Sequence, residues 1–135
     1  MSVTYLSAGK VLDFNFGATS YTPPGTLYMG VSTSVIQPDG SGYTEPVGGA
    51  YARVAVTNNK TNFTVASNGT LSNATAITFV ESTAAWGTIT YAFLADALTA
   101  GNVYWFEALP TPKAVASATT VLFSIGSLVI SMTNA

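Results

Sequence analysis

Apolar and polar residues alternate along much of the chain, in short runs separated by segments rich in glycine, proline and asparagine. In "TLYMGVS", Leu27, Met29 and Val31 share one face of a predicted strand, because successive side chains of a strand point to opposite faces. The same alternation groups Val54 with Val56; Ile89 with Tyr91 and Phe93; Val121 with Phe123 and Ile125; and Leu128 with Ile130 and Met132. This pattern is typical of half-buried antiparallel strands.

Turn-forming residues separate these runs, notably in "TPPG", "PDGSG", "SNGT" and "TAGN". Only Gly126 and Ser127 separate the last two runs, which predicts a β-hairpin between them. About seven to nine short strands at this spacing favour an all-β fold, an antiparallel β-sandwich or jelly-roll-like single domain. We therefore expect a β-sandwich domain over residues 21–135.

The first residues of the chain depart from this alternation, and we assign residues 1–20 to an N-terminal arm or short helix. Within residues 4–16, the apolar side chains Tyr5, Leu6, Leu12 and Phe16 roughly follow a helical stripe. This spacing predicts a short N-terminal helix.

The run "VYWFEAL" is apolar on both faces of the strand that it predicts. A strand of this kind is either a core strand covered by a loop of its own chain or an aromatic patch covered by a neighbouring subunit. On the second alternative, the candidate interface aromatics are Tyr104, Trp105 and Phe106.

Charged residues make up 7% of the 135-residue chain, against about 25% in ordinary soluble domains, while 48% of its residues are hydrophobic. A surface so poor in charge indicates contact with other protein, so we expect an oligomer; a monomer coated with serine, threonine and asparagine is the alternative. The net charge of −2 disfavours nucleic acid as a partner. No membrane span is expected, because the most apolar segment, "VLFSIGSLVISM", is far shorter than the roughly 20 residues that a spanning helix needs.

The sequence contains neither cysteine nor histidine, which excludes disulfides, thiolate metal sites and Ser-His-Asp or Cys-His catalysis. Its six carboxylates are scattered without the spacing of a catalytic pair, so we expect no enzyme activity and no cofactor. One metal hypothesis concerns "DGSGYTE", in which Asp39, Ser41 and Glu45 could offer oxygens to Ca²⁺. The alternative, which we favour, is a glycine-rich turn in which Asp39 hydrogen-bonds its own backbone.

The chain has a single arginine, Arg53, at the start of a predicted strand and on the face opposite Val54 and Val56. A guanidinium can form planar, bidentate hydrogen bonds with a carboxylate. The partner is either Glu45 of the preceding loop, as a structural clamp, or a carboxylate across a subunit boundary, as an assembly contact. We favour the clamp because Glu45 is close in the sequence.

Several motifs in fixed order resemble a family of small virion proteins of tailed bacteriophages, some of them capsid cement (decoration) proteins and others described as tail-fibre-like. The motifs are "EPVGGAYAR" followed by "VTNN", and "WGTIT" followed by "DALTAGN", and the resemblance extends from about Thr22 to Ser131. The chain departs from the family pattern at "AFLADA" and at Ala100-Gly101, where a glycine pair is usual. Both departures lie near a turn and therefore affect the expected loop shape more than the fold.

The resemblance implies a structural virion protein, for which we predict a capsid cement protein that binds the assembled shell and stabilises it. On this prediction the protein is a homotrimer, its partner is the major capsid protein, and it lies on the capsid surface of a virion assembled in the bacterial cytoplasm. The alternative is a tail-fibre or receptor-binding module that recognises cell-surface glycan. Its candidate contacts are Tyr43, Tyr51 and Trp86, although each of these is as readily a packing residue.

Overall fold

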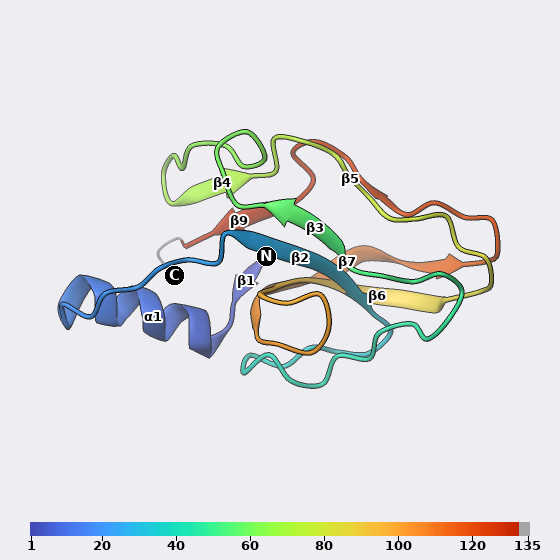
Figure 1. Ribbon diagram of the computed structural model, residues 1–135, viewed down its shortest axis with the longest axis horizontal. Helices are drawn as coiled ribbons and strands as arrows, with labels where there is room; N and C mark the ends of the chain where they lie inside the picture. Colours follow the sequence, from blue (N-terminus) through green and yellow to red (C-terminus); the bar gives the residue numbers. More distant parts are fainter. Residues whose placement is uncertain (133–135) are drawn as a thin grey trace.

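A five-stranded antiparallel sheet forms the centre of the computed structural model, which describes residues 1–132 (Figure 1). Its strands lie in the order β1 (Ser2–Val3), β7 (Val103–Val115), β6 (Gly87–Ala95), β2 (Thr26–Ser32) and β3 (Val54–Thr57). Two short ribbons complete the strands, β4 (Thr70–Ser72) with β9 (Val129–Ser131) and β5 (Ile77–Thr78) with β8 (Leu122–Phe123). The single described helix is α1 (Tyr5–Phe16).

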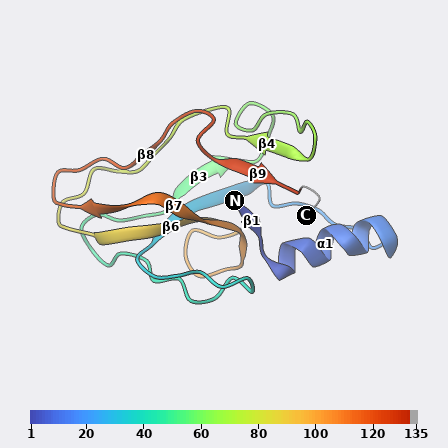
Figure 2. The same ribbon diagram turned by 180° about the vertical axis from the view of Figure 1, so that it is seen from behind.

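The sheet is covered on both faces. The two ribbons and their connections cover one face, and the segments around residues 34–53 and 96–102 lie on the other (Figures 1 and 2). The main core fills the space under the ribbons, where Met29, Phe79 and Leu128 are buried. The predicted all-β single domain with a short N-terminal helix is confirmed. The second layer is built of short ribbons, however, and this strand order does not confirm a jelly roll.

The alternation in β2 is confirmed on one face, since Leu27, Met29 and Val31 all belong to the main core. The opposite face of this strand is not open to solvent. A Cβ atom added to Gly30 would overlap the ring of Phe93, which is fully buried in a second, smaller cluster. The expectation of half-buried strands is therefore wrong for the middle of the sheet, because loops of the same chain cover its second face.

An irregularity in the pairing of β6 with β7 changes which side chains of β6 share a face. The pairing of β6 with β7 shifts register between Ile89 and Tyr91, so Ile89 faces the main core whereas Tyr91 and Phe93 face the smaller cluster. Ala92 continues the core-facing set beyond this irregularity. The predicted grouping of Ile89 with Tyr91 and Phe93 is wrong, because the regular alternation of β6 is broken where its pairing partner jumps from Lys113 to Ala108.

The predicted hairpin between the last two runs is also wrong. β8 pairs with β5 and β9 pairs with β4, so the two runs lie in different ribbons. The buried side chain of Asn73 separates them: its amide nitrogen donates to the Ser124 carbonyl at 2.9 Å, and its oxygen accepts from the Leu128 backbone at 3.0 Å. The Ser124 carbonyl and the Leu128 N–H, on either side of the turn, therefore bond to the side chain of Asn73.

Thr4 fixes the start of α1 on the edge of the sheet. Its hydroxyl accepts from the Ser7 backbone at 3.4 Å, as an N-cap, and donates to the Val103 carbonyl at 2.8 Å. β1 precedes it and pairs with β7, so the first residues of the chain are part of the sheet. Beyond this anchor α1 extends past the end of the sheet (Figures 1 and 2). Among the described residues, no helix is long and apolar enough to span a membrane.

Candidate functional site

Arg53 is the centre of a polar network under the loop-covered face of the sheet. Its Nε donates to Glu45 Oε1 at 2.9 Å and its Nη2 donates to Glu45 Oε2 at 2.8 Å, which is a bidentate ion pair. Its Nη1 donates to the carbonyls of Ala97 and Ala100 at 2.7 and 2.9 Å. One side chain thus joins the loop before β3 to the turn between β6 and β7.

Aromatic rings pack around the guanidinium of this network. The guanidinium lies 5.0 Å from the ring centre of Phe93 and 5.8 Å from that of Tyr43. The Tyr51 hydroxyl donates to Glu45 Oε1 at 2.7 Å and accepts from the Val31 backbone of β2 at 3.1 Å. Burial and the neighbouring carboxylate raise the pKa of Tyr51 far above its usual value, so it stays a hydrogen-bond donor at all physiological pH values.

The charge of Arg53 is retained despite its burial. Burial alone would lower the pKa of the guanidinium, but the hydrogen bonds and the charge of Glu45 outweigh that effect, and the pKa is raised. The side chain is only 1% exposed, and four of its N–H groups donate within the chain. This geometry is that of the structural clamp, and it leaves little of Arg53 for a carboxylate of another subunit.

The turn that receives Arg53 is shaped by Asp96. Its carboxylate accepts from the Asn102 backbone at 2.7 Å and from the Asn102 amide at 2.9 Å. Ala100 and Gly101 both take positive φ angles, +52° and +71°. The departure from the family's glycine pair therefore places a Cβ atom at a position that favours glycine, and the carbonyl of that strained residue is one of the two that bind Arg53.

The candidate calcium ligands are engaged in other contacts. Asp39 Oδ1 accepts from the Ser41 backbone at 2.9 Å and from the Ser41 hydroxyl at 2.6 Å, and these bonds lower the pKa of Asp39. Glu45 is held by Arg53 and Tyr51. Within residues 1–132, no three acidic, histidine or cysteine side chains are grouped as they would be around a metal ion. The local geometry is that of the glycine-rich turn.

The aromatics proposed for glycan contact are mostly packing residues. Trp86 is 4% exposed, donates from Nε1 to the Gly49 carbonyl at 2.8 Å and meets Tyr51 edge to face. Tyr43 packs against Phe93 beside the clamp. The expectation that Trp86 grips a glycan is wrong, because its ring lies in the main core.

The three interface candidates on β7 have different surroundings. Tyr104 is buried by the chain itself, Phe106 packs against the smaller cluster, and Trp105 packs at the edge of the main core. Tyr104 and Trp105 also line a pocket of about 230 Å³ beside α1. Its floor is formed by the buried side chains of Leu27, Phe63 and Leu94.

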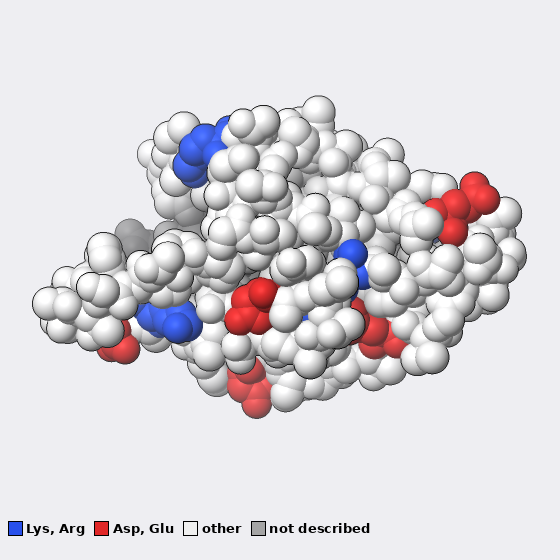
Figure 3. Space-filling model, viewed as in Figure 1, with Lys and Arg blue, Asp and Glu red and all other residues white. Residues whose placement is uncertain are grey.

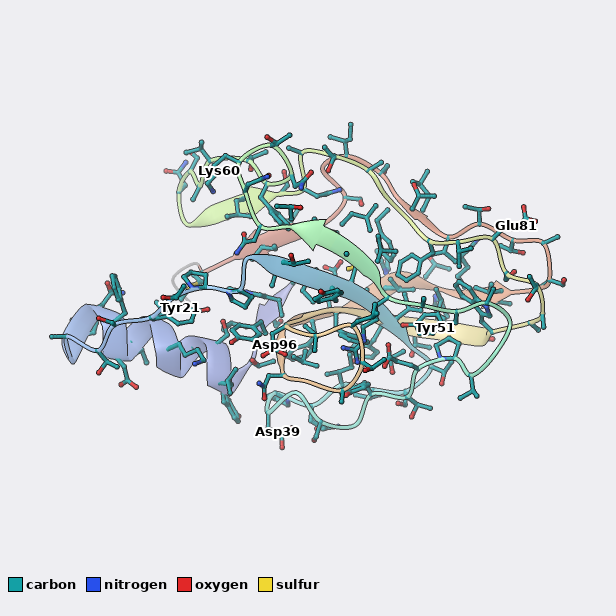
Figure 4. All side chains as sticks on the ribbon, in the orientation of Figure 1. Tyr21, Asp39, Tyr51, Lys60, Glu81 and Asp96 are labelled. Atoms are coloured by element: carbon teal, nitrogen blue, oxygen red, sulfur yellow. The ribbon has the colours of Figure 1, made fainter. Side chains whose placement is uncertain are left out.

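Residues from seven separate parts of the chain line this pocket. Two of its lining residues, Tyr21 and Lys60, are labelled in Figure 4, which shows Tyr21 next to α1 and Lys60 in the loop between β3 and β4. The remaining lining residues are Ser7, Val11, Pro23, Pro24, Asn58, Leu71 and Ile130. Polar groups stand mainly at the mouth, where Asn58 and Lys60 are exposed, and the interior is apolar. Such a pocket suits an apolar side chain more than a charged ligand.

The sequence predicts the apolar residues of α1 but not their exposure to solvent. The predicted apolar side chains are there, but they point to solvent: Tyr5 is 71% exposed and Phe16 is 86% exposed. Only Ser7 of this helix is buried. Charged groups form only small, separate patches on the face seen in Figure 3, as the composition indicated. The spacing of apolar residues predicts the helix but does not predict whether its apolar side is buried or exposed.

Fold and site together define a small β-structured protein built around an internal clamp, with an apolar helix and pocket at one end. The family model of the podophage GP4 fiber I protein gp80 matches residues 2–131, so the chain belongs to this family of phage fibre proteins. The resemblance to small virion proteins of tailed phages is confirmed. The family description is that of a structural protein, in line with a non-enzymatic role. No curated protein matches the chain.

Proposed function

We propose that the protein is a structural subunit of a fibre on the surface of a tailed-phage virion. The observation that carries this proposal is the match to a fibre protein over nearly the whole chain, residues 2–131. It favours the tail-fibre alternative over the capsid cement protein that the sequence first suggested. The same proposal places the protein on the virion, attached through the fibre rather than spread over the capsid surface.

The structure supports a role in assembly. The clamp joins the loop before β3 to the turn between β6 and β7 through an ion pair and two backbone hydrogen bonds, as a structural subunit needs in order to hold its loops in place. The apolar helix and pocket at the other end provide surface for contact with further protein. We propose that this contact joins copies of the chain, as a homotrimer, and that the major capsid protein is a partner only on the cement hypothesis.

Phage particles test the two functions directly. An antibody against this protein, seen by electron microscopy, should label fibres at the tail of wild-type particles. Particles that lack the protein should retain their DNA on heating as wild type does but adsorb poorly to host cells, and complementation should restore adsorption. Label distributed over the whole capsid, with early DNA loss on heating and normal adsorption, would instead establish the cement protein.

A further inference from the structure

The pocket beside α1 has room for a small organic molecule. Its volume is about 230 Å³, and its floor of Leu27, Phe63 and Leu94 is buried. An apolar cavity of about 150 Å³ holds a benzene molecule, which is about 25 Å³ for each carbon atom. At that ratio the pocket accommodates an apolar body of about nine carbon atoms. An aromatic ring with a short chain attached is a group of this size.

Ser7 brings an unpaired polar group to this pocket. It is the buried residue of α1, only 4% exposed, and it lines the pocket. Its backbone N–H donates to the Thr4 hydroxyl, but its own hydroxyl has no hydrogen-bond partner among residues 1–132. In that part of the chain, every fully enclosed polar side-chain atom has a partner, so the Ser7 oxygen is reached from the open space of the pocket. It is available to a polar atom of a bound molecule.

The mouth of the pocket carries positive charge. Lys60 lines it and is exposed, and its ammonium donates one hydrogen bond, to the Thr64 carbonyl at 3.0 Å, which leaves two further N–H groups. A second ammonium, that of Lys10, lies 5.3 Å from the ring centre of Tyr21, another lining residue. No acidic side chain among residues 1–132 lines the pocket. Charge complementarity therefore favours a ligand with an anionic group.

We propose that this pocket binds a small carboxylic acid with an apolar body and one further polar group. The body fills the interior over Leu27, Phe63 and Leu94, while the carboxylate stays at the mouth beside Lys60, so no charge is buried. Ser7, on the α1 wall of the pocket, hydrogen-bonds the further polar group. Ligand sites commonly combine an apolar lining with a few placed polar groups in this way. This inference goes beyond the proposed function, because it does not depend on where the protein lies in the virion.

Purified protein and a set of small probes test the site. The probes are phenylpropionate, its para-hydroxy derivative, phenylpropanol and phenylpropylamine, which share one apolar body and differ in charge or in the ring hydroxyl. Amide NMR titrations measure each dissociation constant and identify the residues that shift. We expect the hydroxylated acid to bind most tightly, with a Kd of about 1 mM or lower, followed by phenylpropionate and phenylpropanol. Phenylpropylamine should bind most weakly, because it brings a second cation to Lys60.

Single changes separate the three contacts, with circular dichroism to check folding. Lys60→Met should weaken both acids about two- to fivefold and leave phenylpropanol unchanged, because an exposed ion pair contributes little. Lys113→Met, at an exposed cation that does not line the pocket, is the matched control and should change nothing. Ser7→Ala should weaken the hydroxylated acid alone, about two- to tenfold. Val11→Phe fills the pocket and should abolish binding of every probe, and Ile130→Phe does so from β9 if the first variant fails to fold.

Several results would overturn the proposal. They are no saturable binding of either acid by wild type, equal affinity for the acid and the amine, binding that survives in the filled pocket, and Lys113→Met as disruptive as Lys60→Met. Equal weakening of both acids by Ser7→Ala would reject the contact with Ser7. Acid binding by a protein that labels the whole capsid would reject the fibre assignment and leave the site standing, whereas labelled fibres without acid binding would do the reverse.

Discussion

The clamp around Arg53 and the exposed apolar stripe of α1, formed by Tyr5, Leu12 and Phe16, differ in how far the chain itself covers and pairs their side chains. Arg53 is 1% exposed on its side chain and donates to Glu45 and to two carbonyls of the next turn. Phe16, by contrast, is 86% exposed and belongs to a helix with only one buried residue. The chain itself pairs the polar groups of the clamp, whereas it leaves most apolar side chains of the helix exposed.

Different physical costs explain this contrast. A buried charge or carbonyl without a partner costs several kcal/mol, so polar groups inside the domain have to be paired as the chain folds. Exposed apolar area costs only about 25 cal/mol per Å², and that cost is recovered when a second protein covers it. The clamp therefore supports the fold, whereas the exposed stripe adds little to the stability of the single chain.

Removal of the clamp should have the largest effect on the free energy of unfolding. Arg53→Ala leaves the Glu45 carboxylate and the Ala97 and Ala100 carbonyls without their donor, which we expect to cost about 3–5 kcal/mol. Leu12→Ser on the stripe should change the same quantity for the monomer by less than about 0.5 kcal/mol. Urea denaturation at low protein concentration measures both.

A double-mutant cycle shows whether Glu45 and Arg53 act as one unit. Arg53→Lys should lower stability because an ammonium cannot reproduce the bidentate geometry. Glu45→Gln should matter much less once Arg53 is changed, with a coupling of about 0.5–3 kcal/mol. Lys113→Ala, at an exposed cation of β7, is the control and should be nearly neutral. Additive effects of the two clamp changes would falsify the clamp.

Much of the fold follows from local pattern. The faces of β2 and β3 and the presence of the N-terminal helix could be predicted, because each depends on residues close together in the sequence. The register shift between β6 and β7 and the position of Asn73 could not, since each depends on pairing with a distant segment. Asn73 lies about 50 residues from the turn that it holds, so no local signal indicates its role.

The site divides in the same way. The partnership of Arg53 with Glu45 was proposed from their closeness in the sequence, but the carbonyls of Ala97 and Ala100, 44 and 47 residues away, were not. Trp86 and Tyr51 could not be told from exposed aromatics, because burial depends on the whole fold. One signal was available for the turn: Ala100 at a usual glycine position already pointed to an unusual backbone there.

That alanine provides the next prediction, an increase in stability on the clamp side. Ala100 holds φ at +52°, where an L-residue loses about 1–2 kcal/mol relative to glycine. Ala100→Gly removes this strain but adds about 0.5–1 kcal/mol of backbone entropy to the unfolded chain. We expect a net gain of about 0.5 kcal/mol by urea denaturation. Ala97→Gly, whose φ is not positive, is the control and should lower stability; equal effects of the two changes would contradict the strain.

The smallest effect is expected at an exposed turn of the loop between β2 and β3, where Asp39 binds the hydroxyl and backbone of Ser41. The Ser41 hydroxyl and backbone hold the pKa of Asp39 below its usual value of about 3.9. A folded-state pKa below the unfolded one stabilises the protein above pH 3.9, and this contribution is lost as pH falls through the folded pKa. Ser41→Ala removes the stronger bond and should raise the pKa of Asp39, whereas Ser41→Thr keeps the hydroxyl and should not.

A carboxyl NMR titration of Asp39 in the three proteins measures this directly. Because Asp39 is exposed, its hydrogen bonds should shift the pKa while changing the melting temperature at pH 7 less than Ala100→Gly does. Such a result would show that the exposed hydrogen bonds of Asp39 add little to the stability of the folded protein, because water competes for the same groups. The buried hydrogen bonds of Arg53 do not face this competition. An unchanged pKa in Ser41→Ala would mean that the Ser41 hydroxyl does not bind Asp39 in solution.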